Sequence, residues 1–116
     1  MKINNNSIWK LNKKLNCESF NIVYLIQCTK DNCRMRYIGE SKRPLKFRLA
    51  DHRGYVVNNH NTATGAHFNL PGHSVANISV TILEQVKKDD ENYRKEREKF
   101  FIRKFNTFYN GINRQP

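Results

Sequence analysis

Short apolar runs along the chain predict three strands. The uncharged run 21–28 and the run 35–39 are rich in β-branched and aromatic residues, and the pair Asp31-Asn32 between them favours a turn. Together they predict a β-hairpin that Gly39 closes. Residues 78–83 alternate between apolar and polar side chains, which predicts a third strand.

Helical spacing follows the hairpin. A helix is expected over about 43–57, with Ser41 as its N-cap and Pro44 in its first turn. Its apolar stripe consists of Leu45, Leu49 and Val56. Asp89 and Asp90 favour the start of a second, charged helix that runs to about Phe105. The order strand, strand, helix, strand, helix predicts a small α+β fold, a three-stranded antiparallel sheet flanked by helices.

The remaining segments are mostly polar. Residues 1–20 are expected to form an N-terminal extension, either a tail or a short helix around 8–15, and residues 21–116 form the domain. Residues 58–75 are rich in Asn, Thr, Gly and His, which predicts an irregular connection, and residues 106–116 predict a polar tail.

The composition and net charge of the chain narrow the class of molecule that it binds. At 116 residues the chain is one domain, and its net charge of +11 favours a polyanion such as nucleic acid. An anionic membrane surface is a weaker alternative, and no apolar run approaches the roughly 20 residues that a membrane span needs. We expect an intracellular protein with no membrane partner, since residues 1–14 lack the apolar stretch of a secretory signal. The candidate DNA-binding residues lie on the first helix and just before it: Lys42, Arg43, Lys46 and Arg53.

A polar cluster has no obvious packing role. The predicted hairpin carries Tyr24 and Tyr37, and the helix after it carries Arg48 and His52, four residues apart and hence on one face. Taken singly, each tyrosine is explained as a half-buried strand residue with a satisfied hydroxyl. Packing alone does not explain the ordered set that these tyrosines, Arg48 and His52 form together with Glu98 and Asn113.

Glu98 lies in line with Phe101, Ile102 and Phe105 on the inner face of the last predicted helix. A carboxylate there is costly unless it is paired or binds a metal. A salt bridge to Arg94 or Arg97 is the plain alternative to metal binding.

Cysteine and histidine spacings indicate a second kind of site. Cys28 and Cys33 flank the predicted turn, and His67 and His73 follow the first helix, so that Cys-x4-Cys and His-x5-His match the ligands of a structural Cys2His2 zinc site. Such a metal would hold the irregular connection against the hairpin. Solvated loop histidines, a buried Cys28 without a ligand role and a Cys28–Cys33 disulfide remain open alternatives.

The chain resembles the GIY-YIG nuclease domain over residues 21–114. Tyr24 matches the tyrosine of the first motif, Tyr37-Ile38-Gly39 matches the second, and the glycine of the first motif is missing. The resemblance implies a DNA endonuclease that hydrolyses phosphodiester bonds with one Mg²⁺ or Mn²⁺ held by Glu98. It also implies a late catalytic asparagine, Asn113, with Asn110 as the second candidate.

The resemblance gives roles to the polar cluster. Arg48 would clamp the phosphate with its planar set of donors. Tyr24, Tyr37 and His52 would supply the proton-transfer and orienting groups, with Tyr24 favoured as general base and His52 equally able to take or relay the proton. A tyrosine acts as a base only if a metal or Arg48 lowers its pKa from about 10.

The cysteine and histidine pairs narrow the resemblance to the endonuclease domain of Penelope-like retroelements. That subgroup implies a nick at a chromosomal target, a reverse transcriptase domain in the same polypeptide, and nuclear residence. A single active site per chain predicts a monomer or weak dimer. The alternative function is a non-catalytic, zinc-stabilised nucleic-acid-binding module, for which the basic residues alone suffice.

Overall fold

Three antiparallel strands form the centre of the structure. The computed structural model describes residues 2–3, 15–87 and 90–116. Its strands are β1 (Lys2–Ile3), β2 (Ile22–Cys28), β3 (Arg36–Ser41) and β4 (Ile78–Gln85), in the sheet order β1-β4-β2-β3. β2 pairs antiparallel with both β3 and β4, while the two-residue β1 adds to the outer edge of β4 in parallel. The predicted α+β fold with a three-stranded antiparallel sheet is confirmed.

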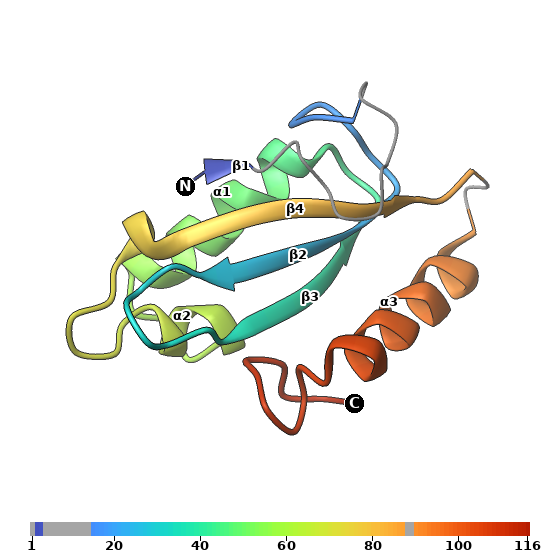
Figure 1. The fold of residues 1–116 in the computed structure, drawn as a ribbon. Coiled ribbons are helices and arrows are strands. Elements are labelled where there is room, and N and C mark those ends of the chain that lie inside the picture. The colour runs from blue at the N-terminus through green and yellow to red at the C-terminus, as the bar shows by residue number, and fades with distance from the viewer. Residues whose placement is uncertain (1, 4–14, 88–89) are drawn as a thin grey trace.

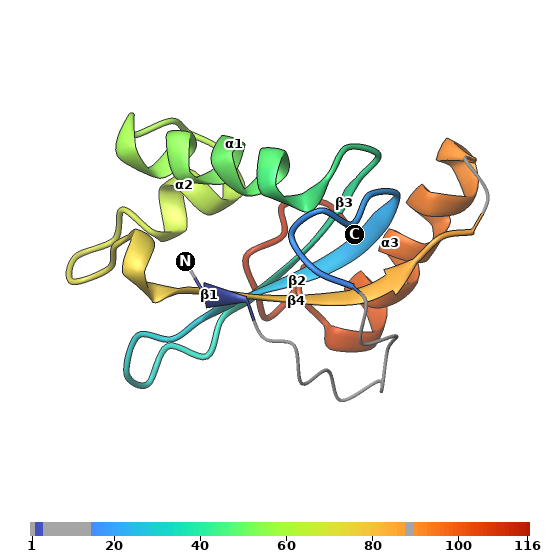
Figure 2. The same ribbon diagram turned by 90° about the horizontal axis from the view of Figure 1, so that it is seen from above.

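Helices cover both faces of this sheet. The helical elements are α1 (Leu45–Val57), α2 (Ala63–His67), the 3-10 turn η1 (Val75–Asn77) and α3 (Glu91–Phe105). The views in Figures 1 and 2 place α1 and α2 on one side of the sheet and α3 on the other. No helix in the described part of the chain is long and apolar enough to cross a membrane.

The alternation of side chains along β2 divides the core into two clusters. Ile22, Tyr24 and Ile26 face α1, whereas Val23 and Leu25 face α3. Leu45, Leu49 and Val56, the stripe predicted for the first helix, are buried in the first cluster, and Phe101 and Ile102 of α3 are buried in the second. Because β2 is covered on both faces from Ile22 to Ile26, its sequence there is a continuous run of buried apolar and aromatic residues rather than an alternating one.

Several boundaries differ from the prediction. Ser41 is the last residue of β3 rather than an N-cap, and Pro44 precedes α1 without a side-chain cap hydrogen bond. Asp90 caps α3, its side chain accepting from the Tyr93 backbone N–H, whereas Asp89 lies outside the described residues. The possible helix around 8–15 also falls almost wholly outside the described residues.

Two segments expected to be irregular are ordered against the core. The connection 58–75 contains α2, which Thr62 caps by accepting from the Gly65 backbone N–H. A five-residue helix is too short to show an apolar period, so the sequence pattern misses it. After α3, the chain turns at Asn106 in the left-handed conformation and returns to bury Ile112.

Candidate active site and metal centre

A pocket of about 250 Å³ opens beside β3, the edge strand of the sheet. Elements from both faces meet there, since β3 provides Tyr37, α2 provides Ala63 and α3 provides Glu98 and Ile102. The rest of the wall comes from Lys99 and the C-terminal residues Asn113, Arg114, Gln115 and Pro116. Three of the predicted site residues, Tyr37, Glu98 and Asn113, therefore share one pocket.

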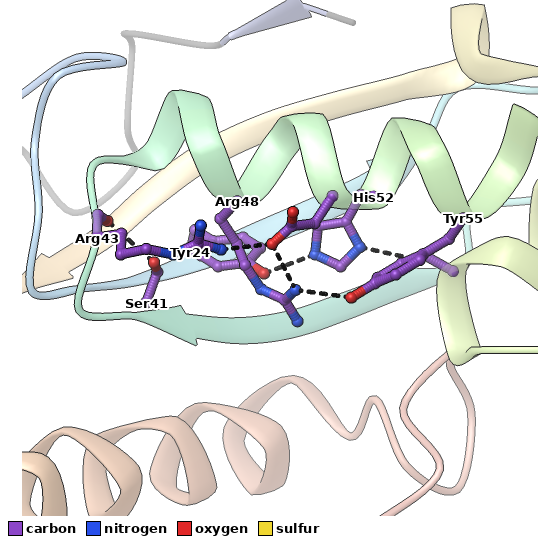
Figure 3. Close-up of polar contacts among 8 residues, drawn as sticks. Tyr24, Ser41, Arg43, Arg48, His52 and Tyr55 are labelled. Atoms are coloured by element: carbon purple, nitrogen blue, oxygen red, sulfur yellow. Dashed lines mark hydrogen bonds and ion pairs between the residues drawn. The ribbon is translucent and has the colours of Figure 1, made fainter.

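The face of α1 that is turned toward the strands carries Arg48, His52 and Tyr55 (Figure 3). Arg48 Nη1 donates to the Tyr55 hydroxyl at 3.3 Å and lies 3.4 Å from the Asp51 carboxylate. The His52 ring meets the rings of Tyr24, Tyr37 and Tyr55 edge-on, at centroid distances of 5.8, 5.5 and 5.7 Å. The helical spacing thus brings Arg48 and His52 to the two tyrosines, as predicted.

Tyr24 lies at the bottom of this group with no exposed surface. Its hydroxyl lies 2.7 Å from His52 Nε2. Burial and the neighbouring Tyr37 raise the pKa of Tyr24, while the positive charge of Arg48 acts to lower it. Gly39 on β3 is packed against the Tyr24 ring so closely that any Cβ there would overlap it. This contact explains why a glycine stands at the third position of the Tyr37-Ile38-Gly39 motif on β3.

Tyr37 is the more accessible of the two tyrosines. It is half-buried and lines the pocket with Glu98. Burial raises the pKa of Tyr37, and Arg48 acts against that shift. Arg48 therefore influences both hydroxyls, so that one guanidinium supports whichever tyrosine loses a proton.

Glu98 is a partly desolvated carboxylate. Burial and the nearby Glu40 raise the pKa of Glu98 to about 7. The two arginines considered as its salt-bridge partners pair elsewhere, Arg94 with Glu40 at 2.5 Å and Arg97 with Glu84 at 2.7 Å. A half-buried carboxylate at a pocket wall with a raised pKa fits a divalent cation, whose positive charge would restore the ionised form.

Asn113 is held by the backbone of the edge strand. Its Oδ1 accepts from the Ile38 N–H at 2.8 Å, and its Nδ2 donates to the Ile38 carbonyl at 2.9 Å. The Ile112 N–H also donates to the Arg36 carbonyl at 2.8 Å. These bonds fasten the C-terminal segment along β3 and set that wall of the pocket.

The four predicted zinc ligands lie together beside the turn of the β2–β3 hairpin. The ligand atoms of Cys28, Cys33, His67 and His73 all lie within 4.8 Å of one another. All three cysteines are free, so the structure has no Cys28–Cys33 disulfide. The sequence prediction that these residues can bind one metal ion is supported by this geometry.

The hydrogen bonding and protonation of the side chains in this cluster suit the binding of a cation. The buried His73 Nε2 has no hydrogen-bond partner among the described residues, whereas its Nδ1 contacts the Pro71 carbonyl at 3.2 Å. Burial lowers the pKa of His67, which keeps its ring neutral. Although burial acts to raise it, the neighbouring His73 side chain and a backbone hydrogen bond from Met35 bring the pKa of Cys33 below its ordinary value. A neutral imidazole and an easily formed thiolate are the ligands that Zn²⁺ prefers.

The candidate DNA-binding side chains lie on the outer surface of the first helix and its approach. Lys42, Arg43, Lys46 and Arg53 are all exposed. Arg43 pairs with Asp51, and Lys46 pairs with Glu18. These contacts reduce the charge that two of the four present to a polyanion.

Sequence reasoning missed three members of the site. Tyr55 stands three residues after His52 on the same helical face, and that spacing was available as a signal. Thr64, 2.7 Å from His52 Nδ1, and Glu40, paired with Arg94, come from distant parts of the chain, so that only the fold brings them together.

Comparisons with known proteins agree with this geometry. The family model of the GIY-YIG catalytic domain matches residues 20–113. Among solved structures, the catalytic domain of the homing endonuclease I-TevI superposes with a TM-score of 0.64 at 24% sequence identity, covering 81% of this chain and 97% of that domain. At this identity the likeness concerns the fold. A comparison with curated proteins gave no match.

Proposed function

The chain belongs to the GIY-YIG family of DNA endonucleases, and on that premise we propose that it nicks DNA with one divalent cation bound at Glu98. The observation that carries the proposal is the pocket at the β3 edge. There the Glu98 side chain of α3 and the Tyr37 side chain of β3 line the same pocket. Arg48 is close enough to influence the pKa of Glu98, Tyr24 and Tyr37.

Each side chain has a part in phosphodiester hydrolysis. A Mg²⁺ or Mn²⁺ ion at Glu98 would supply Lewis-acid stabilisation of the charge that develops on the phosphate. Arg48 donates to the phosphate oxygens from its planar fork. A tyrosine that has lost its own proton takes a proton from the attacking water, whose oxygen bonds to phosphorus as the bond to the 3′ oxygen breaks. The leaving 3′ oxygen takes a proton from solvent water. The products are a 3′-hydroxyl and a 5′-phosphate.

The two tyrosines divide this work by exposure. Tyr37 lines the pocket, so that its hydroxyl is the one placed to meet water, whereas Tyr24 is sealed behind it against His52. We therefore favour Tyr37 for contact with the water and Tyr24 for the buried hydrogen-bonded group that orients it. Single-turnover cleavage by Tyr24→Phe and Tyr37→Phe tests this division, and greater loss in Tyr24→Phe would reverse it.

Zn²⁺ is the metal that the Cys28, Cys33, His67 and His73 cluster fits best. Four protein ligands leave no open position, which is the arrangement of structural rather than catalytic zinc. Bound there, the ion would join the β2–β3 hairpin to α2 and the loop that follows it, and so hold one side of the active site in place.

The finer assignment is to the endonuclease of a Penelope-like retroelement. It is supported by the cysteine pair between the two tyrosine strands and the histidine pair after α1, whose ligand atoms converge. In that setting the nick would free a 3′-hydroxyl to prime a reverse transcriptase in the same polypeptide, in the nucleus. The domain would act as a monomer or weak dimer.

A supercoiled-plasmid assay in Mg²⁺ or Mn²⁺ tests the proposal. The parent should convert supercoiled plasmid to open circles, and Glu98→Ala should abolish the conversion. Glu96→Ala, an exposed carboxylate two residues away, is the matched control and should cleave normally. Linear product at early times would contradict nicking. Binding without cleavage by the folded parent would instead support the non-catalytic module.

A further inference from the structure

His52 is held from both sides by hydroxyl groups. Its Nε2 lies 2.7 Å from the Tyr24 hydroxyl, and its Nδ1 lies 2.7 Å from the Thr64 hydroxyl (Figure 3 shows the His52 ring beside Tyr24). Tyr24 has no exposed surface, and His52 and Thr64 are each 1% exposed. The three side chains therefore form a hydrogen-bonded chain that water does not reach.

The imidazole in this chain is neutral. Burial and the positive charge of Arg48 lower the pKa of His52 to about 3. A neutral imidazole has one nitrogen that donates and one that accepts, and the partners of the two nitrogens decide which is which. Thr64 and Tyr24 between them thus determine where the His52 hydrogen lies.

The hydroxyl of Thr64 has one way to satisfy its hydrogen. Among the described residues, His52 Nδ1 is the hydrogen-bond partner found for this hydroxyl. If His52 Nδ1 carried the hydrogen, the buried Thr64 O–H would have no acceptor, at a cost of about 1–3 kcal/mol. If Nδ1 accepts, the Thr64 hydrogen is satisfied, Nε2 carries the hydrogen of the ring, and the Tyr24 oxygen accepts it. The buried Tyr24 O–H is then turned away from His52 and has no acceptor among the described residues until Tyr24 loses its proton.

From this geometry we propose that Thr64 is a positioning residue that donates to His52 Nδ1 and fixes His52 as the tautomer whose Nε2–H donates to the Tyr24 oxygen. Tyr24 would then accept from His52, and the positive charge of Arg48 acts on the Tyr24 hydroxyl in the same direction. A donor to the phenol oxygen and a nearby positive charge both favour the tyrosinate over the tyrosine. Thr64 therefore acts on the reaction through His52 and touches no reacting atom.

The position of Thr64 gives this role a structural basis. It lies on α2, whose neighbouring residue Ala63 lines the active-site pocket and whose last residue His67 belongs to the Cys/His cluster. The residue after the helix, Phe68, has no exposed surface. A short helix held at its end in this way presents the Thr64 hydroxyl to α1 from a fixed place.

The effect on cleavage rests on the proposed function, whereas the tautomer does not. We would label the histidine rings with ¹⁵N and read the state of His52 by NMR in the parent, Thr64→Val and Thr64→Ser. The parent and Thr64→Ser should carry the hydrogen on Nε2. Valine has nearly the shape of threonine but no hydroxyl, so Thr64→Val should shift the hydrogen toward Nδ1, with the Tyr24 hydroxyl then donating to Nε2.

Steady-state plasmid nicking supplies the second readout. Thr64→Val should lower kcat by about tenfold to a hundredfold with KM changed less than about twofold, because only orientation at the reacting centre is lost. Thr64→Ser should restore most of the rate. Thr107→Val is the matched control, since Thr107 is also 1% exposed and its hydroxyl has no partner among the described residues.

The outcomes are separable. Hydrogen on Nδ1 in the parent, or an unchanged tautomer in Thr64→Val, would overturn the assignment. A shifted tautomer with parental kcat would overturn the positioning role. A parent that shows the expected tautomers but cleaves no DNA with any divalent cation supports the Thr64 assignment and overturns the proposed function.

Discussion

The Arg94 guanidinium lies 2.5 Å from the Glu40 carboxylate and joins α3 to β3 one helical turn before Glu98. Arg94 is 3% exposed, and its Nη1 also donates to the Asn21 side-chain oxygen at 2.7 Å. Because Arg94 and Glu98 are four residues apart on one helix, this buried pair sets how α3 lies against the sheet, and with it the place of Glu98.

Arg94→Ala should lower the free energy of unfolding by about 3–5 kcal/mol, since it leaves the partly buried Glu40 carboxylate without its partner. Urea unfolding at neutral pH measures the change. Lys95→Ala is the control, because Lys95 pairs with Glu91 on the exposed side of the same helix, where a pair contributes less than about 1 kcal/mol. Equal losses in the two variants would contradict the role given to Arg94.

The raised pKa of Glu98 predicts a pH dependence of stability. Its pKa is about 7 in the folded chain against 4.5 as the ordinary value, so this group stabilises the fold fully at low pH. That contribution is lost as pH rises from about 4.5 to 7, and remains absent above. The loss should be about 1–2 kcal/mol, less than the shift alone implies because the carboxyl partly reaches water.

The measurement is urea unfolding across this pH range, without added Mg²⁺ or Mn²⁺ and without a chelator that would strip the Cys/His cluster. Glu98→Gln should lack the decline, since it has no group to ionise. Adding Mn²⁺ at pH 7 should stabilise the parent and leave Glu98→Gln unchanged. Parallel pH curves for the two chains would count against the assignment.

We expect replacement by alanine to have opposite effects on stability at Gly39 and at Gly54. Gly39→Ala should destabilise by about 1–3 kcal/mol and reduce cleavage, because the new Cβ overlaps the Tyr24 ring. Gly54→Ala should stabilise by up to about 1 kcal/mol, because it lies in α1 and the nearest atom to its new Cβ is Asn58 Nδ2 at 3.9 Å. Thermal unfolding of both variants checks the two signs together.

The Cys/His cluster predicts one tightly held zinc per chain. Cys33→Ser should reduce the bound zinc, measured by elemental analysis, and should lower stability by several kcal/mol because metal binding and folding are coupled. Cys17→Ser, outside the cluster, should keep the full metal content. Equal zinc in the two variants would show that the metal lies elsewhere.

Arg53 predicts a simple contribution to DNA affinity. It is exposed on α1, and no ion pair involving it is found among the described residues. Arg53→Ala should weaken binding at low salt and reduce the slope of log affinity against log salt by about 1. Arg43→Ala should change that slope less, since Arg43 pairs with Asp51. Fluorescence anisotropy with a catalytically inactive chain measures both slopes.

The sequence predicts the parts of this fold that local patterns determine. The hairpin, the third strand and the two long helices follow from β-branched runs and apolar spacing, and the Cys and His pairs follow from ligand spacing. What it misses depends on tertiary contact. Thr64 meets His52 only because α2 packs against α1, and Glu98 becomes available only because Arg94 and Arg97 find partners on β3 and β4.

The Asn113 bonds to both backbone groups of Ile38 have a consequence for assembly. Edge strands are the places where a β-sheet recruits a strand from another molecule. Here the C-terminal segment already occupies the hydrogen-bonding positions of β3 at Ile38 and Arg36. This part of the β3 edge, next to the active site, is thereby closed to the addition of a strand from another molecule.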